Sequence, residues 1–163
     1  MKTTLRLYPV LSFFAISLLL SCTTSSQTKL PDTWQPGMKL TMSYGGGMRY
    51  YSYNIEISDT GSFYSVNNEG TVTTSSLNIT SKDLQELLAL LKKHRLDRIR
   101  TETKGLIYDK GTQSIALSWS GNYIGASDGS TTAIAEKSME DFNAISTWVF
   151  QLVEKSKEKV KDK

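Results

Sequence analysis

One cysteine and one histidine are the residues of this chain whose side chains most readily do chemistry. His94 lies in the run Lys92-Lys93-His94-Arg95. A metal site or an activated nucleophile would need convergent partners that this basic surrounding does not supply, so we interpret His94 as a structural residue. Cys22 has no second cysteine with which to form an intrachain disulfide, so its thiol is left for another kind of chemistry.

The other motifs that could carry catalysis are incomplete. Gly45-Gly46-Gly47 is followed by Met48 and a strand pattern rather than by a Gly-Lys-Ser sequence and a helix, so the phosphate-binding templates fail. No serine lies in a Gly-x-Ser-x-Gly elbow, and no carboxylate pair or metal-ligand spacing stands out. The sequence therefore predicts no enzyme activity, no cofactor and no metal site. A catalytic site assembled from distant residues stays open as an alternative.

The first 22 residues contain the three parts of an export signal in the right order. Lys2 and Arg6 make a positive start, residues 7–20 are mainly apolar and uncharged, and a small serine precedes the cysteine. This apolar segment is too short for a spanning helix, which needs about 20 residues. Residues 19–22, Leu-Leu-Ser-Cys, resemble the lipobox of bacterial lipoprotein precursors.

The resemblance to lipoprotein precursors implies a specific fate for Cys22. It implies a signal peptide at residues 1–21, a diacylglyceryl group on the Cys22 thiol, and a further acyl chain such as palmitate on the amine freed by cleavage. Two or more chains make a stable anchor, because each buried CH₂ adds about 0.8 kcal/mol. Thr23 and Thr24 follow with no aspartate, which resembles outer-membrane lipoproteins facing the periplasm if the cell is Gram-negative. An ordinary secretory signal and an uncleaved anchor are the alternatives.

The composition of the chain after the signal peptide bounds its size and partners. Residues 22–163 are enough for one domain with a real hydrophobic core. Loss of Lys2 and Arg6 lowers the formal net charge from +3 to +1. Because the chain is then nearly neutral, nothing in its charge favours binding to nucleic acid.

The same chain divides into three parts. Residues 22–37 are polar, contain two prolines and show no apolar period, which predicts a lipidated N-terminus followed by a flexible linker. Trp34 is the exception, and we expect it to pack on the edge of the domain. Residues 38–155 carry the apolar patterns of a single α+β domain. Residues 156–163 form a charged run, which predicts a solvated C-terminal tail.

Alternation of apolar and polar residues predicts an antiparallel sheet within that domain. Turn signals at residues 59–61 and 67–70 separate the first strands, and Ser120-Gly121-Asn122 marks a later turn. The predicted strands are the meander segments at residues 40–44, 51–58 and 62–66 and from residue 71, and then the later hairpin at residues 115–119 and 123–127.

Two amphipathic helices complete the predicted α+β fold, in which both pack on the sheet. Thr80 is a good N-cap with Asp83 at the third helical position, and the helix is expected to end near residues 96–98. A stripe at helical spacing marks each buried side. The first stripe is Leu84, Leu87, Leu88 and Leu91, and the second is Phe142, Ile145, Trp148, Val149, Leu152 and Val153.

The order of these elements resembles that of small bacterial envelope-lipoprotein domains of unknown function. In these, a strand with a turn like Asp59-Thr60-Gly61 is followed by a helix opening like residues 79–84, and then by a hairpin and a C-terminal helix. The resemblance covers roughly residues 40–155. It implies no catalytic residues.

Two groups of side chains are candidates for a binding surface. Tyr50 and Tyr51 are neighbours on a strand, so they point to opposite faces and at least one is exposed. Lys92, Lys93 and Arg95 could bind anionic head groups or an acidic partner. The alternative for this basic group is that it complements the dipole of a helix whose first turn is acidic, an arrangement that the second helix repeats.

These features and resemblances together predict a membrane-anchored envelope lipoprotein that acts as a non-catalytic binding or structural module. Its predicted partners are the membrane, through the lipid on Cys22, and an envelope protein or a cell-wall component. One alternative is an inhibitor that blocks an exported hydrolase with a loop such as residues 45–48. The other is an enzyme with an unrecognised site.

Overall fold

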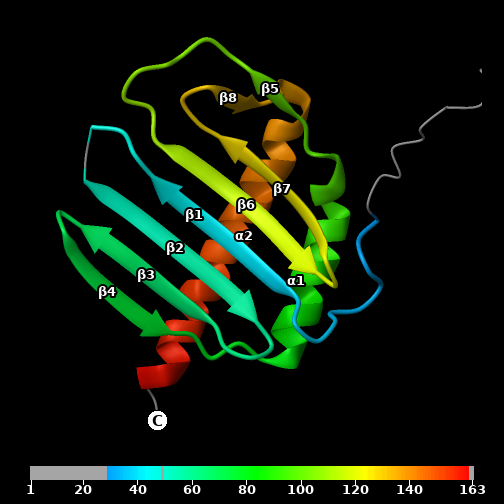
Figure 1. The fold of residues 1–163 in the computed structure, drawn as a ribbon. Coiled ribbons are helices and arrows are strands. Elements are labelled where there is room, and N and C mark those ends of the chain that lie inside the picture. Colours follow the sequence, from blue (N-terminus) through cyan, green and yellow to red (C-terminus); the bar gives the residue numbers. More distant parts are fainter. Residues whose placement is uncertain (1–28, 49, 162–163) are drawn as a thin grey trace, which may run out of the picture.

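A single antiparallel sheet forms the centre of the molecule (Figure 1). The computed structural model describes residues 29–48 and 50–161, with side chains to residue 157. The strands of the meander are β1 (Lys39–Gly45), β2 (Tyr51–Ser58), β3 (Phe63–Asn68) and β4 (Thr71–Ser76), and those of the later hairpin are β6 (Thr112–Trp119) and β7 (Asn122–Asp128). Their order in the sheet is β4-β3-β2-β1-β6-β7. The predicted combination of a meander and a later hairpin is confirmed.

Strand β1 joins the meander to the hairpin. Leu40 lies opposite Ile57 of β2 and Leu117 of β6. All three side chains are fully buried, because alternate residues of each strand point to the same face of the sheet. The first and the sixth strand in the chain are therefore neighbours, a pairing that no local pattern in the sequence specifies.

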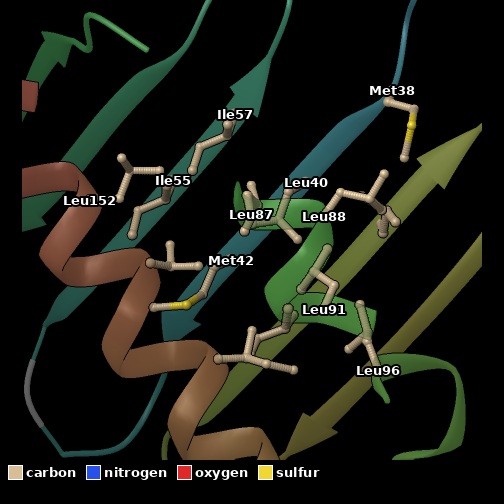
Figure 2. Packing of buried hydrophobic residues seen from close by; sticks show 14 of the residues in the cluster. Met38, Leu40, Met42, Ile55, Ile57, Leu87, Leu88, Leu91, Leu96 and Leu152 are labelled. Atoms are coloured by element: carbon tan, nitrogen blue, oxygen red, sulfur yellow. The ribbon is translucent and has the colours of Figure 1, made fainter. Parts of the chain in front are cut away.

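Two helices, α1 (Ser81–Lys93) and α2 (Glu136–Lys161), cover one face of this sheet (Figure 1). Figure 2 shows Leu87 and Leu88 of α1 close to Leu40 of β1 and Leu152 of α2 close to Ile55 of β2. The predicted packing of both amphipathic helices on the sheet is confirmed. In the described chain no helix covers the other face, where the Ser43 and Ser114 hydroxyl groups are hydrogen-bonded at 2.8 Å.

Helix α1 begins as expected and ends earlier. The Asp83 N–H donates to the Thr80 hydroxyl at 3.2 Å, and the Asp83 carboxylate accepts from the Thr80 N–H at 2.9 Å, which confirms the capping box. The expected end near residues 96–98 is wrong. Arg95 takes a left-handed conformation with φ 48°, so a separate 3₁₀ helix, η1 (Leu96–Arg98), follows.

The predicted linker at residues 22–37 is wrong for its second half. Leu30 and Trp34 are buried, and the Trp34 N–H donates to Gln85 Oε1 of α1 at 3.3 Å. Lys92 also donates to the Asp32 carbonyl at 3.0 Å. Residues 30–37 therefore belong to the domain, because the side chains of Leu30 and Trp34 pack against the hydrophobic core. Cys22 and the predicted signal peptide lie outside the described residues.

The predicted tail at residues 156–163 is wrong for its first two residues, which contact the domain, and α2 continues to Lys161. Residues 162–163 lie outside the described residues. Ser156 is fully buried, and it comes one turn after Leu152 and Val153 of the apolar stripe. The ammonium group of Lys157 lies 4.1 Å from the ring centroid of Tyr64. The helix therefore keeps its contacts with the sheet beyond the expected domain end at residue 155.

A second, two-stranded sheet of β5 (Thr101–Thr103) and β8 (Thr132–Ile134) was not expected. Strands of three residues are too short to produce a recognisable alternation. This small sheet fixes the start of α2, because the Ala135 N–H donates to the Arg100 carbonyl at 2.8 Å. It thereby brings the start of α2 close to the segment that follows η1.

Candidate functional site

Aromatic side chains of three neighbouring strands form a continuous cluster at one end of the sheet. Tyr44 of β1 lies opposite Tyr53 of β2, and their rings stack with centroids 5.8 Å apart. Tyr53 also meets Phe150 of α2 edge-on at 5.1 Å and Tyr64 of β3 at 6.5 Å. Aromatic rings attract one another at these separations. The cluster therefore ties the sheet to α2 and extends the core toward the surface.

The cluster reaches the surface at Tyr50 and Tyr51, where the chain forms an open cavity of about 1120 Å³. The Tyr51 ring centroid lies 6.3 Å from that of Tyr44, and Tyr50 is 86% exposed. The expectation that at least one of the two tyrosines is exposed is confirmed, but the expectation that both lie on one strand is wrong, because β2 begins at Tyr51 and Tyr50 belongs to the preceding loop. We call this region the tyrosine end, and its lining residues are Tyr44, Met48, Tyr50, Tyr51, Asn68, Glu69 and Gly70.

The turn between β3 and β4 contributes part of the cavity wall. Glu69 and Gly70 have φ values of 52° and 87°, as a two-residue hairpin turn requires. The Glu69 N–H donates to the Tyr50 carbonyl at 2.8 Å, and the Gly70 N–H donates to Asn67 Oδ1 at 3.0 Å. These bonds hold Tyr50 beside Glu69. Glu69 is the one charged residue among the described residues that line the cavity.

A glycine on a neighbouring loop makes room for the Tyr44 ring. Gly111 immediately precedes β6, and a Cβ atom at this position would collide with the ring and hydroxyl of Tyr44. Any larger residue would therefore push the Tyr44 ring out of its place in the cavity wall. The conformation of the wall depends on this close approach as well as on the strands themselves.

The inner tyrosines are unsuited to proton transfer near neutral pH. Burial raises the pKa of Tyr53 to about 12, the neighbouring Tyr51 adds to the rise, and a side-chain hydrogen bond with Gln113 opposes it. Burial, followed by the hydrogen bond with Tyr51, raises the pKa of Tyr64 to about 12. Both hydroxyl groups therefore stay protonated, and the cluster offers aromatic faces and neutral hydrogen-bonding groups to a ligand.

The basic candidates Lys92, Lys93 and Arg95 lie away from the tyrosines, at the end of α1 (Figure 1). Lys93 and Arg95 are exposed, and Lys92 is paired with the Asp32 carboxylate at 3.4 Å. The structure therefore does not bring the five predicted binding residues together. It divides them between two separate regions of the surface.

His94 fastens α1 to α2. Its Nδ1 atom lies 2.8 Å from Asp141 Oδ1, across the gap between the end of the first helix and the first turns of the second. The His94 side chain is 17% exposed. This contact supports the structural interpretation of His94. The partner is the Asp141 carboxylate, which the basic neighbours of His94 in the sequence gave no reason to expect.

The described residues contain no group of three His, Cys, Asp or Glu side chains that could hold a metal ion. Among the helices that the structure describes, none is long and apolar enough to cross a bilayer. No protein-family model matches the chain, and no curated protein sequence matches it.

Sequence reasoning missed some of the residues that now define the two regions. For Asn68 and Glu69 the sequence predicts only a turn, although a turn beside a tyrosine-rich strand is a signal that could have indicated their place in the cavity wall. Lys137 lies in the first turn of α2, far from Arg95 in the sequence, yet both line one hollow. No local pattern could have found that second pairing, because β5 and β8 create it.

Proposed function

We propose that this chain is a membrane-anchored envelope lipoprotein whose domain acts by binding, with the tyrosine end as the contact surface. The observation that carries the proposal is the open cavity of about 1120 Å³ lined by exposed aromatic side chains. Tyrosine is enriched at protein interfaces, because its ring supplies apolar area and its hydroxyl finds a polar partner.

The chemistry of the cavity favours binding over catalysis. A hydrolase would need at least two convergent polar groups with complementary roles. The described lining residues include a single carboxylate, that of Glu69, and no histidine, cysteine or lysine. Aromatic faces beside an amide and one carboxylate suit an envelope protein or a cell-wall component, both of which present apolar groups together with hydrogen-bonding groups.

Photo-crosslinking in intact cells tests the binding proposal. A photo-reactive residue in place of Tyr50 is expected to give a discrete adduct with an envelope protein or with cell-wall material. Tyr123 provides a matched control, because it is also exposed (69%) but lies at the other end of the strands, next to Ser118 and Lys39 in the ladder. Equal adducts from both positions, or none from Tyr50, would contradict the proposal.

Activity assays on the purified chain test the enzyme alternative. We expect no turnover of peptidoglycan, peptide, ester or phosphate substrates. Turnover that survives repurification and is lost in Glu69→Gln would place an active site in the cavity and would overturn the binding proposal.

Fractionation tests the anchor separately. The predicted lipid is attached through the Cys22 thiol, so the Cys22→Ala protein is expected to leave the membrane pellet and to appear in the supernatant without detergent. If the Cys22→Ala protein still pellets with membranes as the parent protein does, an acyl anchor on Cys22 does not hold the chain there.

One observation favours the inhibitor alternative. Met48, in the loop between β1 and β2, is 82% exposed, and it lies beside the exposed Tyr50. Such a projecting pair could enter the substrate cleft of an exported hydrolase. The same Tyr50 crosslinks distinguish this case, because the captured partner would be a hydrolase whose activity the purified chain reduces.

A further inference from the structure

Two adjoining hollows give the surface around η1 an excess of positive charge. One hollow, of about 380 Å³, is lined by Arg95, Arg98, Arg100 and Lys137 together with Asp141. The other, of about 520 Å³, is lined by the basic residues Lys29, Lys92, Arg95 and Arg98 together with the acidic residues Asp32 and Asp97. Arg95 and Arg98 belong to both. We call this region the cationic end; it has six basic and three acidic side chains, and therefore a formal charge of +3.

The acidic side chains at the cationic end already have partners. Asp141 is bonded to His94 at 2.8 Å, Asp32 to Lys92 at 3.4 Å, and Asp97 lies 3.8 Å from Arg98. In the described part of the chain no carboxylate is within ion-pair distance of Arg95, Arg100 or Lys137. These three cations therefore remain available for an external anionic group.

The chain enters the domain at the cationic end. Lys29, the first described residue, lines the same hollow as Arg95 and Arg98. Cys22 precedes Lys29 by seven residues, which can span at most about 25 Å. A bilayer that holds a lipid on Cys22 must therefore lie within that distance of Lys29, which is itself one of the cations of this region.

The tyrosine end lies on the opposite side of the domain. Figure 1 shows the β1–β2 loop and the β3–β4 turn on the left, and the end of α1 with the blue start of the described chain on the right. A surface that approaches the cationic end therefore leaves the cavity at the tyrosine end uncovered.

We propose that the cationic end docks on the anionic phospholipid surface that holds the anchor, and so turns the tyrosine end away from the bilayer. The proposal rests on the proposed function for the lipid on Cys22. Clustered Lys and Arg side chains close to a membrane are attracted to anionic lipid, each changing the partition by about fivefold within a Debye length of about 8 Å. The short segment between Cys22 and Lys29 keeps the domain close to the bilayer, and the attraction of the unpaired cations to anionic lipid orients the domain on it.

Reconstitution of the lipidated protein tests this docking. The protein would carry Ala89→Cys, an exposed site one turn before Lys93, as the position for a fluorescent label. Vesicles of phosphatidylcholine, with or without phosphatidylglycerol, would contain quenchers on the lipid head groups. We expect strong quenching only with phosphatidylglycerol and at low salt. A label at Thr71→Cys, beside the tyrosine end, is expected to stay bright in both vesicles.

Two charge reversals of equal size provide the matched comparison. Arg95→Glu is expected to lower the ratio of docked to undocked protein by about 25-fold, because it removes one positive charge and adds one negative charge. Lys82→Glu, at the exposed start of α1, changes the net charge equally and is expected to leave quenching unchanged. Equal quenching in neutral and anionic vesicles, or equal effects of the two reversals, would overturn the proposal.

Failure of the anchor and failure of docking give different results. Without an acyl anchor the protein would not pellet with phosphatidylcholine vesicles, and docking would then be measured as salt-sensitive pelleting with phosphatidylglycerol vesicles alone. With the anchor intact, the protein would pellet with both kinds of vesicle, and only the quenching difference would decide the docking proposal. An acidic protein as the true partner would appear as the absence of that difference.

Discussion

The tyrosine end and the cationic end of this domain differ in how closely their side chains are held by the rest of the protein. At the tyrosine end, Tyr53 packs between Tyr44 and Phe150, and the surface is a continuation of the core. At the cationic end, exposed Arg95 projects from a left-handed backbone position, and its guanidinium has no acidic partner within the described chain. The first surface suits short-range recognition by shape. The second suits attraction over a Debye length, which salt weakens.

The largest expected effect tests whether the tyrosine end is part of the core. Tyr53→Ala is expected to lower the free energy of unfolding by about 3–5 kcal/mol, because it removes a ring that is only 9% exposed and touches rings on three elements. Urea unfolding measures this loss. Tyr50→Ala is the control, with an expected change under about 0.5 kcal/mol. Equal losses would show that Tyr50 packs against the domain, contrary to its exposure.

Alkaline unfolding gives a second, smaller difference. The folded pKa of Tyr53, about 12, exceeds the ordinary value of 10.0, so above pH 10 the unfolded chain loses a proton that the folded chain keeps. The stabilising contribution is therefore complete below pH 10 and is lost as the pH rises to 12. For Tyr53 the loss amounts to about 2–3 kcal/mol. Tyr64 adds a smaller loss, because solvent screens its partly exposed hydroxyl.

The Tyr53→Phe variant isolates this contribution. It retains the ring but has no hydroxyl to ionise, so the decline in unfolding free energy between pH 10 and 12 should be shallower than in the parent protein. Tyr50→Phe should leave the decline unchanged. Superimposable pH curves for the parent protein and Tyr53→Phe would show that the Tyr53 hydroxyl is not buried from solvent.

The smallest expected effect lies at the cationic end, where stability and docking should change in opposite directions. Arg95→Gly is expected to raise the free energy of unfolding by about 0.5 kcal/mol, because glycine adopts φ 48° without strain and this relief exceeds its extra chain entropy. The same change removes one cation and should weaken docking on anionic vesicles by about fivefold. Thermal unfolding measures the first change, and head-group quenching of the label at Ala89→Cys measures the second.

Arg98→Gly supplies the contrast for that prediction. Arg98 lies in η1 rather than at a left-handed position, so glycine there should cost about 0.5–1 kcal/mol. The loss of docking should be smaller for Arg98→Gly than for Arg95→Gly, because Arg98 already has Asp97 as a partner. A stability loss in both would mean that the left-handed conformation of Arg95 carries no strain.

Local sequence patterns predicted the elements whose formation depends on residues close by in the chain. The α1 capping box joins residues three apart, and the alternation in β2 depends on a strand with one face toward the core, so both are present in short stretches of sequence. The same local reasoning failed for residues 30–37 and 156–157, because their polar composition concealed the burial of Leu30 and Ser156 and indicated only an edge contact for Trp34. Burial in these segments depends on the shape of the core against which they pack, and the composition of a segment carries no information about that shape.

The sequence by itself determined an α+β domain behind a lipobox-like segment, with at least one exposed tyrosine at residues 50–51 and cations at the end of one helix. Only the tertiary structure decided that these candidates form two opposite ends. The β1–β6 pairing, the β5–β8 sheet and the contact of His94 with Asp141 link residues far apart in the chain. Such contacts are stable only once the core has formed, because closing a long loop costs conformational entropy that the contacts within a short stretch of chain cannot offset. The placement of Lys137 beside Arg95 and of Glu69 beside Tyr50 therefore required the folded molecule.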